Sequence, residues 1–261
     1  MQAQSSPALM QALACHFPAH LRMPLDVALA LYGGMQSKSP GLTLAIRKRT
    51  PVYTGEIAAV LAGQSGFVPS GFSLSAASLE AVANFTREAG ISRVLEFGAG
   101  VTTIVLPKLL GEGLRMYLSI EEDEAYAATL RPVLKADPAY RRVSIARLDL
   151  SAEAGTAVTR AGAGSFNATS YRGLRETVQA AFAENGPELV LIDGPSRRAR
   201  WGRFAVLADI AELLPRGTLI LLDDALRHRE VGILDEWRRR GIAEVDSILC
   251  VGTSIGLARV L

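Results

Sequence analysis

The strongest constraint on the fold of this chain comes from two uninterrupted apolar runs, Leu189-Val190-Leu191-Ile192 and Leu219-Ile220-Leu221-Leu222. A strand with no polar residue on either side must be covered on both of its faces. A parallel sheet between two layers of helices meets that requirement, whereas a sheet with one face in water shows alternating polar residues. The two runs therefore predict an α/β fold.

Strand and helix signals alternate from Leu74 to the end of the chain. The expected strands are 93–97, 115–120, 142–148, 188–192, 218–222, 244–250 and 254–260, and the expected helices are 76–89, 102–110, 124–135, 171–184, 205–214 and 229–240. Only residues 251–253 separate the last two strands, too few for a crossover, so these strands should form an antiparallel hairpin. We expect a doubly wound, Rossmann-like sheet of seven strands over 73–261, mostly parallel, with this C-terminal hairpin.

Residues 1–72 do not follow this rhythm. Helical patterns at 8–15, 25–32 and 55–62 flank a loop and a basic strip at 47–49, which predicts an N-terminal helical cap. A cap over the open end of the sheet would supply acceptor contacts or a homodimer surface, and a plain packing extension explains the same pattern.

Composition narrows the function classes. The formal net charge is only +2, so a general attraction to nucleic acid or to anionic membranes is not expected. No apolar run approaches the roughly 20 residues that a membrane-spanning helix needs. Cys15 and Cys250 lie far apart, and the first twenty residues lack the pattern of a secretory signal, so a cytoplasmic protein is expected.

The chemistry-bearing motif is the stretch 94–103, an apolar strand that ends in an acid, two glycines and a pair of hydroxyls: Glu96, Gly98, Gly100, Thr102 and Thr103. Glycines at such a turn allow a ligand to lie against bare main chain, although the bend alone would also require them. The dinucleotide fingerprint would need a third glycine where Thr103 stands. An acid before the turn favours a cationic ligand, since it would repel a pyrophosphate.

This motif resembles the acid-x-Gly-x-Gly motif of the class I S-adenosylmethionine-dependent methyltransferases. The resemblance implies that Glu121, at the end of the second strand, binds the ribose hydroxyls of S-adenosylmethionine, and it assigns the neighbouring Glu122 to the same site. It also places Asp149, just past the third strand, beside the adenine amino group. Each of these acids also fits an ordinary loop or turn.

Three further acids end the next two strands: Asp193, and the adjacent Asp223 and Asp224. The segment 213–224 resembles the fifth-strand motif of the catechol and caffeoyl-coenzyme A O-methyltransferases, which ends in Asp-Asn. That resemblance implies a divalent cation, Mg²⁺ or another, held by the three acids. Here Asp224 replaces the Asn, and the expected Lys after Asp193 is absent. The alternative is a metal-free site in which Asp193 faces the cofactor and an Asp of the pair acts as base.

Two other features complete the predicted site. His228 could remove a proton from an acceptor hydroxyl, or simply start a helix at the surface. Arginines at 197, 198, 200 and 203 with Trp201 could clamp an anionic acceptor, and a glycine-rich insert near 161–165 reads as a mobile lid or a loose surface loop. The sequence thus predicts O-methylation of a small or sugar-like acceptor; the alternatives are an RNA methyltransferase and a non-catalytic scaffold.

Overall fold

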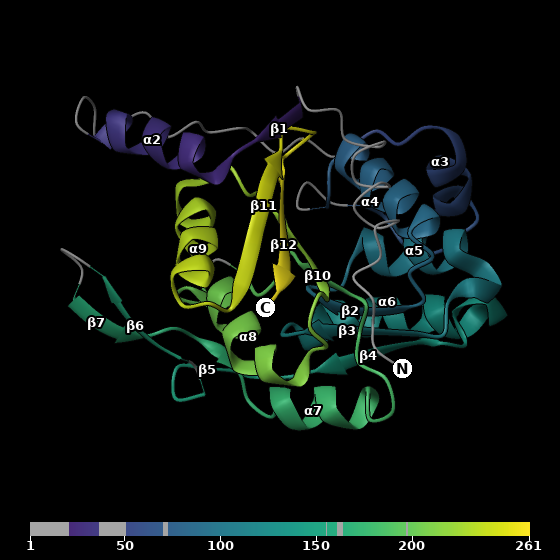
Figure 1. The fold of residues 1–261 in the computed structure, drawn as a ribbon. Helices are drawn as coiled ribbons and strands as arrows, with labels where there is room; N and C mark the ends of the chain where they lie inside the picture. The colour runs from purple at the N-terminus through teal and green to yellow at the C-terminus, as the bar shows by residue number, and fades with distance from the viewer. Residues whose placement is uncertain (1–20, 37–50, 70–72, 155, 161–163, 197) are drawn as a thin grey trace.

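The central sheet has eight strands in the order β1-β11-β12-β10-β9-β2-β3-β4 (Figure 1). The computed structural model describes residues 21–36, 51–69, 73–154, 156–160, 164–196 and 198–261. The strands of this sheet are β1 Arg22–Met23, β2 Arg93–Phe97, β3 Met116–Glu121, β4 Val143–Arg147, β9 Leu189–Ile192, β10 Leu219–Asp223, β11 Ala243–Leu249 and β12 Ile255–Val260.

The pairing of these strands is mostly parallel. Neighbours from β4 through β3, β2 and β9 to β10 run parallel, and β12 pairs antiparallel with both β10 and β11. The predicted C-terminal hairpin is therefore confirmed. The seven strands expected over 73–261 all lie in this sheet. The eighth, β1, comes from the N-terminal region and was not expected, because it pairs with β11 through only two residues, too few to show a periodic sequence pattern.

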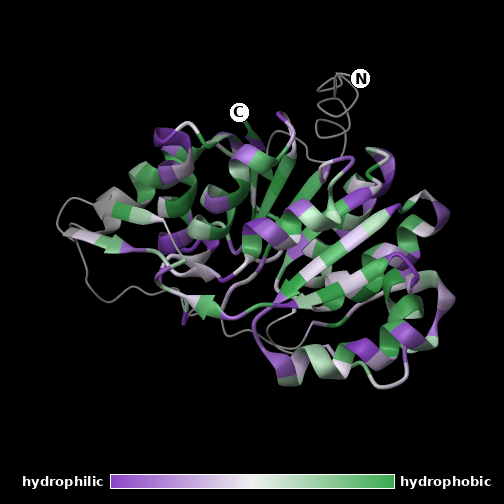
Figure 2. Ribbon diagram, turned by 90° about the horizontal axis from the view of Figure 1, so that it is seen from below, coloured by the Kyte–Doolittle hydropathy of each residue, from purple (hydrophilic) through white to green (hydrophobic). Residues whose placement is uncertain are grey.

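Helices cover both faces of the sheet (Figure 1). Helices α4 Ala76–Glu88, α5 Val101–Leu110 and α6 Glu124–Ala136 pack on one face, and α7 Leu174–Ala181, α8 Gly202–Ile210 and α9 His228–Arg239 pack on the other. The expected helix at 171–184 is shorter because Ser170–Tyr171 pair as strand β8. Hydrophobic residues concentrate on the strands and on the inner sides of the helices (Figure 2), as burial of both sheet faces requires.

The described part of the N-terminal region lies against this α/β unit. Helix α2, Leu25–Gln36, contacts α9, and helix α3, Gly55–Ala62, contacts α5. An ion pair of 2.8 Å between Arg238 and Asp26 links α9 to α2. The expected helix at 8–15 and the basic strip at 47–49 lie outside the described residues. None of the helices within the described ranges has the length and apolar character needed to cross a membrane.

The insert between β4 and α7 contains paired strands. Strand β5, Leu150–Ser151, pairs with β8, and the hairpin of β6, Ala157–Arg160, and β7, Gly164–Asn167, extends away from the body of the molecule (Figure 1). The Arg200 guanidinium lies 3.7 Å from the centre of the Phe166 ring, and the Thr169 N–H donates to the Arg200 carbonyl at 2.8 Å. These contacts fasten the insert to the loop after β9. The tip at 161–163 lies outside the described residues.

The order of the strands fixes where a ligand would bind. The parallel part of the sheet starts at β2. From there the chain proceeds outward through β3 to β4 and then returns to β9 on the other side of β2. In doubly wound sheets, ligands bind at the carboxyl ends of the strands beside such a reversal. The ends of β2, β3, β9 and β10 are the ends where the sequence places its acids.

Candidate active site at the carboxyl ends of the strands

Two glycine backbones touch at the switch point. Gly98, after β2, has a φ of +90°, and a Cβ built on it would lie 2.7 Å from the main-chain nitrogen of Gly194, after β9. A Cβ on Gly194 would lie 2.8 Å from the Gly98 Cα. The space that Gly98 leaves is therefore filled by neighbouring main chain. Gly100 is different: a Cβ there would meet only the Tyr126 hydroxyl, at 3.8 Å, so its surface is open to a ligand.

Glu96 is buried below the turn and is held by the two predicted hydroxyls. Its carboxylate accepts hydrogen bonds from the Thr102 hydroxyl and, at 2.5 Å, from the Thr103 hydroxyl. Thr103 in turn accepts the Gly100 N–H at 2.8 Å. Burial raises the pKa of Glu96, and the two threonine donors oppose that rise. Glu96 thus joins the end of β2 to the first turn of α5 and fixes the shape of the turn between them.

Glu121 ends β3 and supports the same turn from the other side. It accepts the Ala99 N–H at 3.0 Å and the Asp123 N–H at 2.8 Å. Its side chain is buried, and burial raises its pKa to about 7, partly opposed by these N–H donors. A carboxylate offers about four lone-pair sites, so it retains acceptor capacity for a ligand hydroxyl.

Glu122 connects strand β3 to the insert and to the loop after β9. One carboxylate oxygen accepts the Tyr171 hydroxyl at 2.9 Å, and the other accepts the Ser196 N–H at 2.8 Å. Tyr171 is itself buried and its ring lies parallel to that of Phe97, with centroids 6.0 Å apart. Glu122 therefore ties β8 of the insert and the loop after β9 to the strand that carries Glu121.

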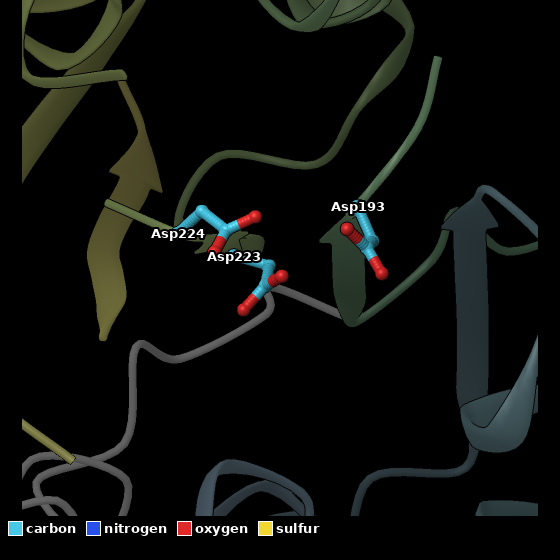
Figure 3. A group of neighbouring side chains, drawn as sticks. All are labelled: Asp193, Asp223 and Asp224. Atoms are coloured by element: carbon cyan, nitrogen blue, oxygen red, sulfur yellow. The ribbon is translucent and has the colours of Figure 1, made fainter. Parts of the chain in front are cut away.

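The three aspartates predicted from the strand ends do come together (Figure 3). One carboxylate oxygen from each of Asp193, Asp223 and Asp224 lies within 4.8 Å of the others, and the latter two residues are buried. Asp223 accepts the Thr253 hydroxyl at 2.9 Å. Asp224 has a φ of +59°, in the left-handed region that Asn and Asp adopt more readily than other side chains.

An arginine lies among these carboxylates. Arg203 of α8 is 3.0 Å from the Asp193 carboxylate and 2.9 Å from the Asp223 carbonyl, to which it donates. Glu230 of α9 lies 3.7 Å away on the same guanidinium, and Asp224 at 4.0 Å. Burial opposes the charged form, but the carboxylates, Asp193 foremost, hold the pKa of Arg203 above its usual value. The sequence pattern did not reveal that this arginine points inward.

The remaining predicted residues lie further out. Asp149 is largely exposed and pairs with Arg147. His228 is exposed at the first residue of α9 and is not part of the three-carboxylate group. The predicted arginine clamp divides: Arg203 faces the aspartates, Arg200 stacks on Phe166, and the residue at 197 lies outside the described ranges.

A small pocket lies between Glu96, below the glycine turn, and two of the aspartates, Asp193 and Asp223. Its lining combines three acids and a hydroxyl with apolar side chains; the lining residues are Leu74, Val82, Glu96, Thr102, Leu191, Ile192, Asp193, Leu221, Asp223 and Ile255. The acids in this lining favour positive charge beside them. The carboxylates can also accept protons or coordinate a cation.

No protein-family model matches the chain, and no curated protein matches it in sequence. Solved structures do match its fold. The O-methyltransferase from Bacillus cereus in complex with SAH matches with a TM-score of 0.50 at 14% identity, covering 91% of this chain and 100% of that one. SAH-bound methyltransferase PaMTH1 from Podospora anserina gives 0.53 at 13%, covering 90% and 96%. Cofactor-bound Rv0187 from MTB gives 0.53 at 20%, covering 91% and 97%. The chain therefore has the fold of these methyltransferases, which is the fold that its motifs predicted.

Proposed function

We propose that this chain is an S-adenosylmethionine-dependent methyltransferase that methylates an oxygen of a small or sugar-like acceptor. The observation that carries the proposal is the gathering of acids at the carboxyl ends of the strands: Glu121 bonds the glycine turn, and Asp193, Asp223 and Asp224 lie together beside it. S-adenosylmethionine, when bound, supplies a methyl group on a positively charged sulfur. Carboxylates near the pocket favour that charge and the ammonium group of the same molecule. The SAH-bound structures of similar fold support this choice of cofactor.

The proposed role of each residue follows from its position. Glu121 would accept the ribose hydroxyls, while Gly100 leaves open main chain beside it. The aspartates at the ends of β9 and β10 lie on the acceptor side, where a carboxylate can remove the hydroxyl proton. Oxygen ligands within 4.8 Å of one another also fit Mg²⁺, which would lower the pKa of a bound hydroxyl. The residues that would hold it are Asp193, Asp223 and Asp224.

Calorimetric titration with S-adenosylmethionine and with SAH tests the cofactor assignment. Glu121→Ala should weaken binding about ten- to a hundredfold, the loss of a charge-assisted pair of hydrogen bonds. Glu124→Ala, an exposed acid on the first turn of α6, is the matched control and should bind as the wild type does. Unchanged affinity in Glu121→Ala would contradict the assignment, and absence of binding to the wild type would contradict the proposed function.

The acceptor class is tested with methyl-labelled cofactor. Label should pass to phenolic or sugar hydroxyls, with nucleic-acid acceptors in the same panel as the contrasting outcome. Each reaction is run after exhaustive chelation and again with added Mg²⁺. Turnover that chelation abolishes and Mg²⁺ restores would support the cation at the aspartates, and full turnover after chelation would support an aspartate acting alone as base.

A further inference from the structure

The carboxylate cluster contains its own positive charges. Arg203 bridges the ends of β9 and β10: it donates to the main-chain carbonyls of Asp193 and Asp223 and pairs with the Asp193 carboxylate. Its side chain is only 11% exposed, so this charge is poorly screened by water. A buried cation in this position is stabilised by the acids and stabilises them in return.

A second arginine serves the other end of the cluster. Arg227, three residues after Asp224, lies 2.5 Å from the Asp224 carboxylate. Its side chain is 26% exposed, and it precedes the first residue of α9. Asp224 therefore has a guanidinium on the surface side and the more distant Arg203 on the buried side.

Three carboxylates, those of Asp193, Asp224 and Glu230, lie within 4.0 Å of these two guanidinium groups. The Asp223 carboxylate also stabilises the charge of Arg203, whose guanidinium bonds the Asp223 carbonyl. The two positive charges offset part of the negative charge that these acids carry when ionised. We propose that Arg203 and Arg227 are the resident counter-ions of this cluster and set its affinity for a divalent cation. Repulsion among the three aspartates, which a divalent cation would also relieve, is thus reduced within the chain.

This inference rests on the proposed function only for what a bound cation would do in the reaction. It makes two claims about the chain itself. The aspartates stay together without a divalent cation, so chelation should leave the thermal unfolding temperature unchanged. The arginines also compete with a cation for the same oxygens, because Arg203 holds Asp193 and Arg227 holds Asp224. Removing either positive charge should therefore tighten cation binding, whereas a purely structural arginine would weaken it when removed.

The test is to measure Mn²⁺ binding to the full chain without cofactor, by calorimetry and by water-proton relaxation. Arg203→Met and Arg227→Gln should each bind Mn²⁺ at least about tenfold more tightly than the wild type, since Coulomb's law gives that factor for one charge against a divalent ion even in a water-like dielectric. Arg203→Lys keeps the charge and is the matched control; it should bind Mn²⁺ as weakly as the wild type.

Each outcome decides. Tight Mn²⁺ binding by the wild type that weakens in the arginine variants would overturn the inference, as would equal affinity in all of them. If Arg203→Met does not fold, Arg227→Gln carries the test, because its side chain is partly exposed. A parallel SAH titration of the wild type separates this inference from the proposed function. If the wild type does not bind SAH, the proposed function is contradicted, and the result on cation binding is unaffected.

Discussion

Glu121 should make the stability of the folded chain depend on pH near neutrality. Burial raises its pKa from 4.5 to about 7 in the folded chain. Between these two values the folded chain keeps a proton on Glu121 that the unfolded chain has lost. The contribution of Glu121 to the free energy of unfolding is therefore complete below about pH 4.5 and falls as the pH rises toward 7. Above that pH it is constant, since Glu121 is then ionised in both states.

The size of this effect follows from the shift. A pKa change of this extent, at about 1.4 kcal/mol per unit, corresponds to roughly 3 kcal/mol lost from the free energy of unfolding across the interval. Glu121→Gln carries no titrating group and resembles the protonated acid. The difference in unfolding free energy between wild type and this variant should therefore decline by roughly that amount, while Glu96 and other buried acids affect both proteins equally.

Urea unfolding at a series of pH values from about 5 to about 7.5 measures this difference. Glu124→Gln is the control. Glu124 is exposed and its hydrogen bond from Arg131 lowers its pKa, so it is ionised throughout the range. The difference in unfolding free energy between the wild type and Glu124→Gln should therefore not change with pH, because both proteins keep Glu121. A wild type and a Glu121→Gln variant with parallel pH profiles would refute the reasoning, since another group would then hold the proton.

Two further pairs of variants test the strand ends. Gly98→Ala should destabilise the chain by about 2 kcal/mol or more, because of its positive φ and its contact with Gly194, whereas Gly100→Ala should unfold like the wild type and bind SAH more weakly. Equal stability of the two variants in urea would contradict this. At Asp224, where φ is +59°, Asp224→Ala should be about 1 kcal/mol less stable than Asp224→Asn, since Asn tolerates the left-handed region; thermal unfolding of both variants decides.

Much of the fold could be predicted from the sequence because its signals are local. Apolar runs such as 189–192 indicate strands covered on both faces, and the three residues expected between the last two strands are too few for a crossover, so they predicted the hairpin of β11 and β12. The acids that follow β9 and β10 were expected at one edge, since parallel strands end on the same side. Strand β1 was missed because a two-residue pairing is set by its partner rather than by its own sequence.

The partners of the site residues depended on tertiary structure. Gly98 reads as room for a ligand, yet Gly194, far along the chain, occupies that room. Arg203 reads as part of a surface cluster, yet α8 turns it toward the aspartates. The sequence by itself determined which residue types gather at the strand ends, because strand periodicity is local. Only the packing of helices on the sheet decided which charges face one another, because such contacts join segments that no local pattern relates.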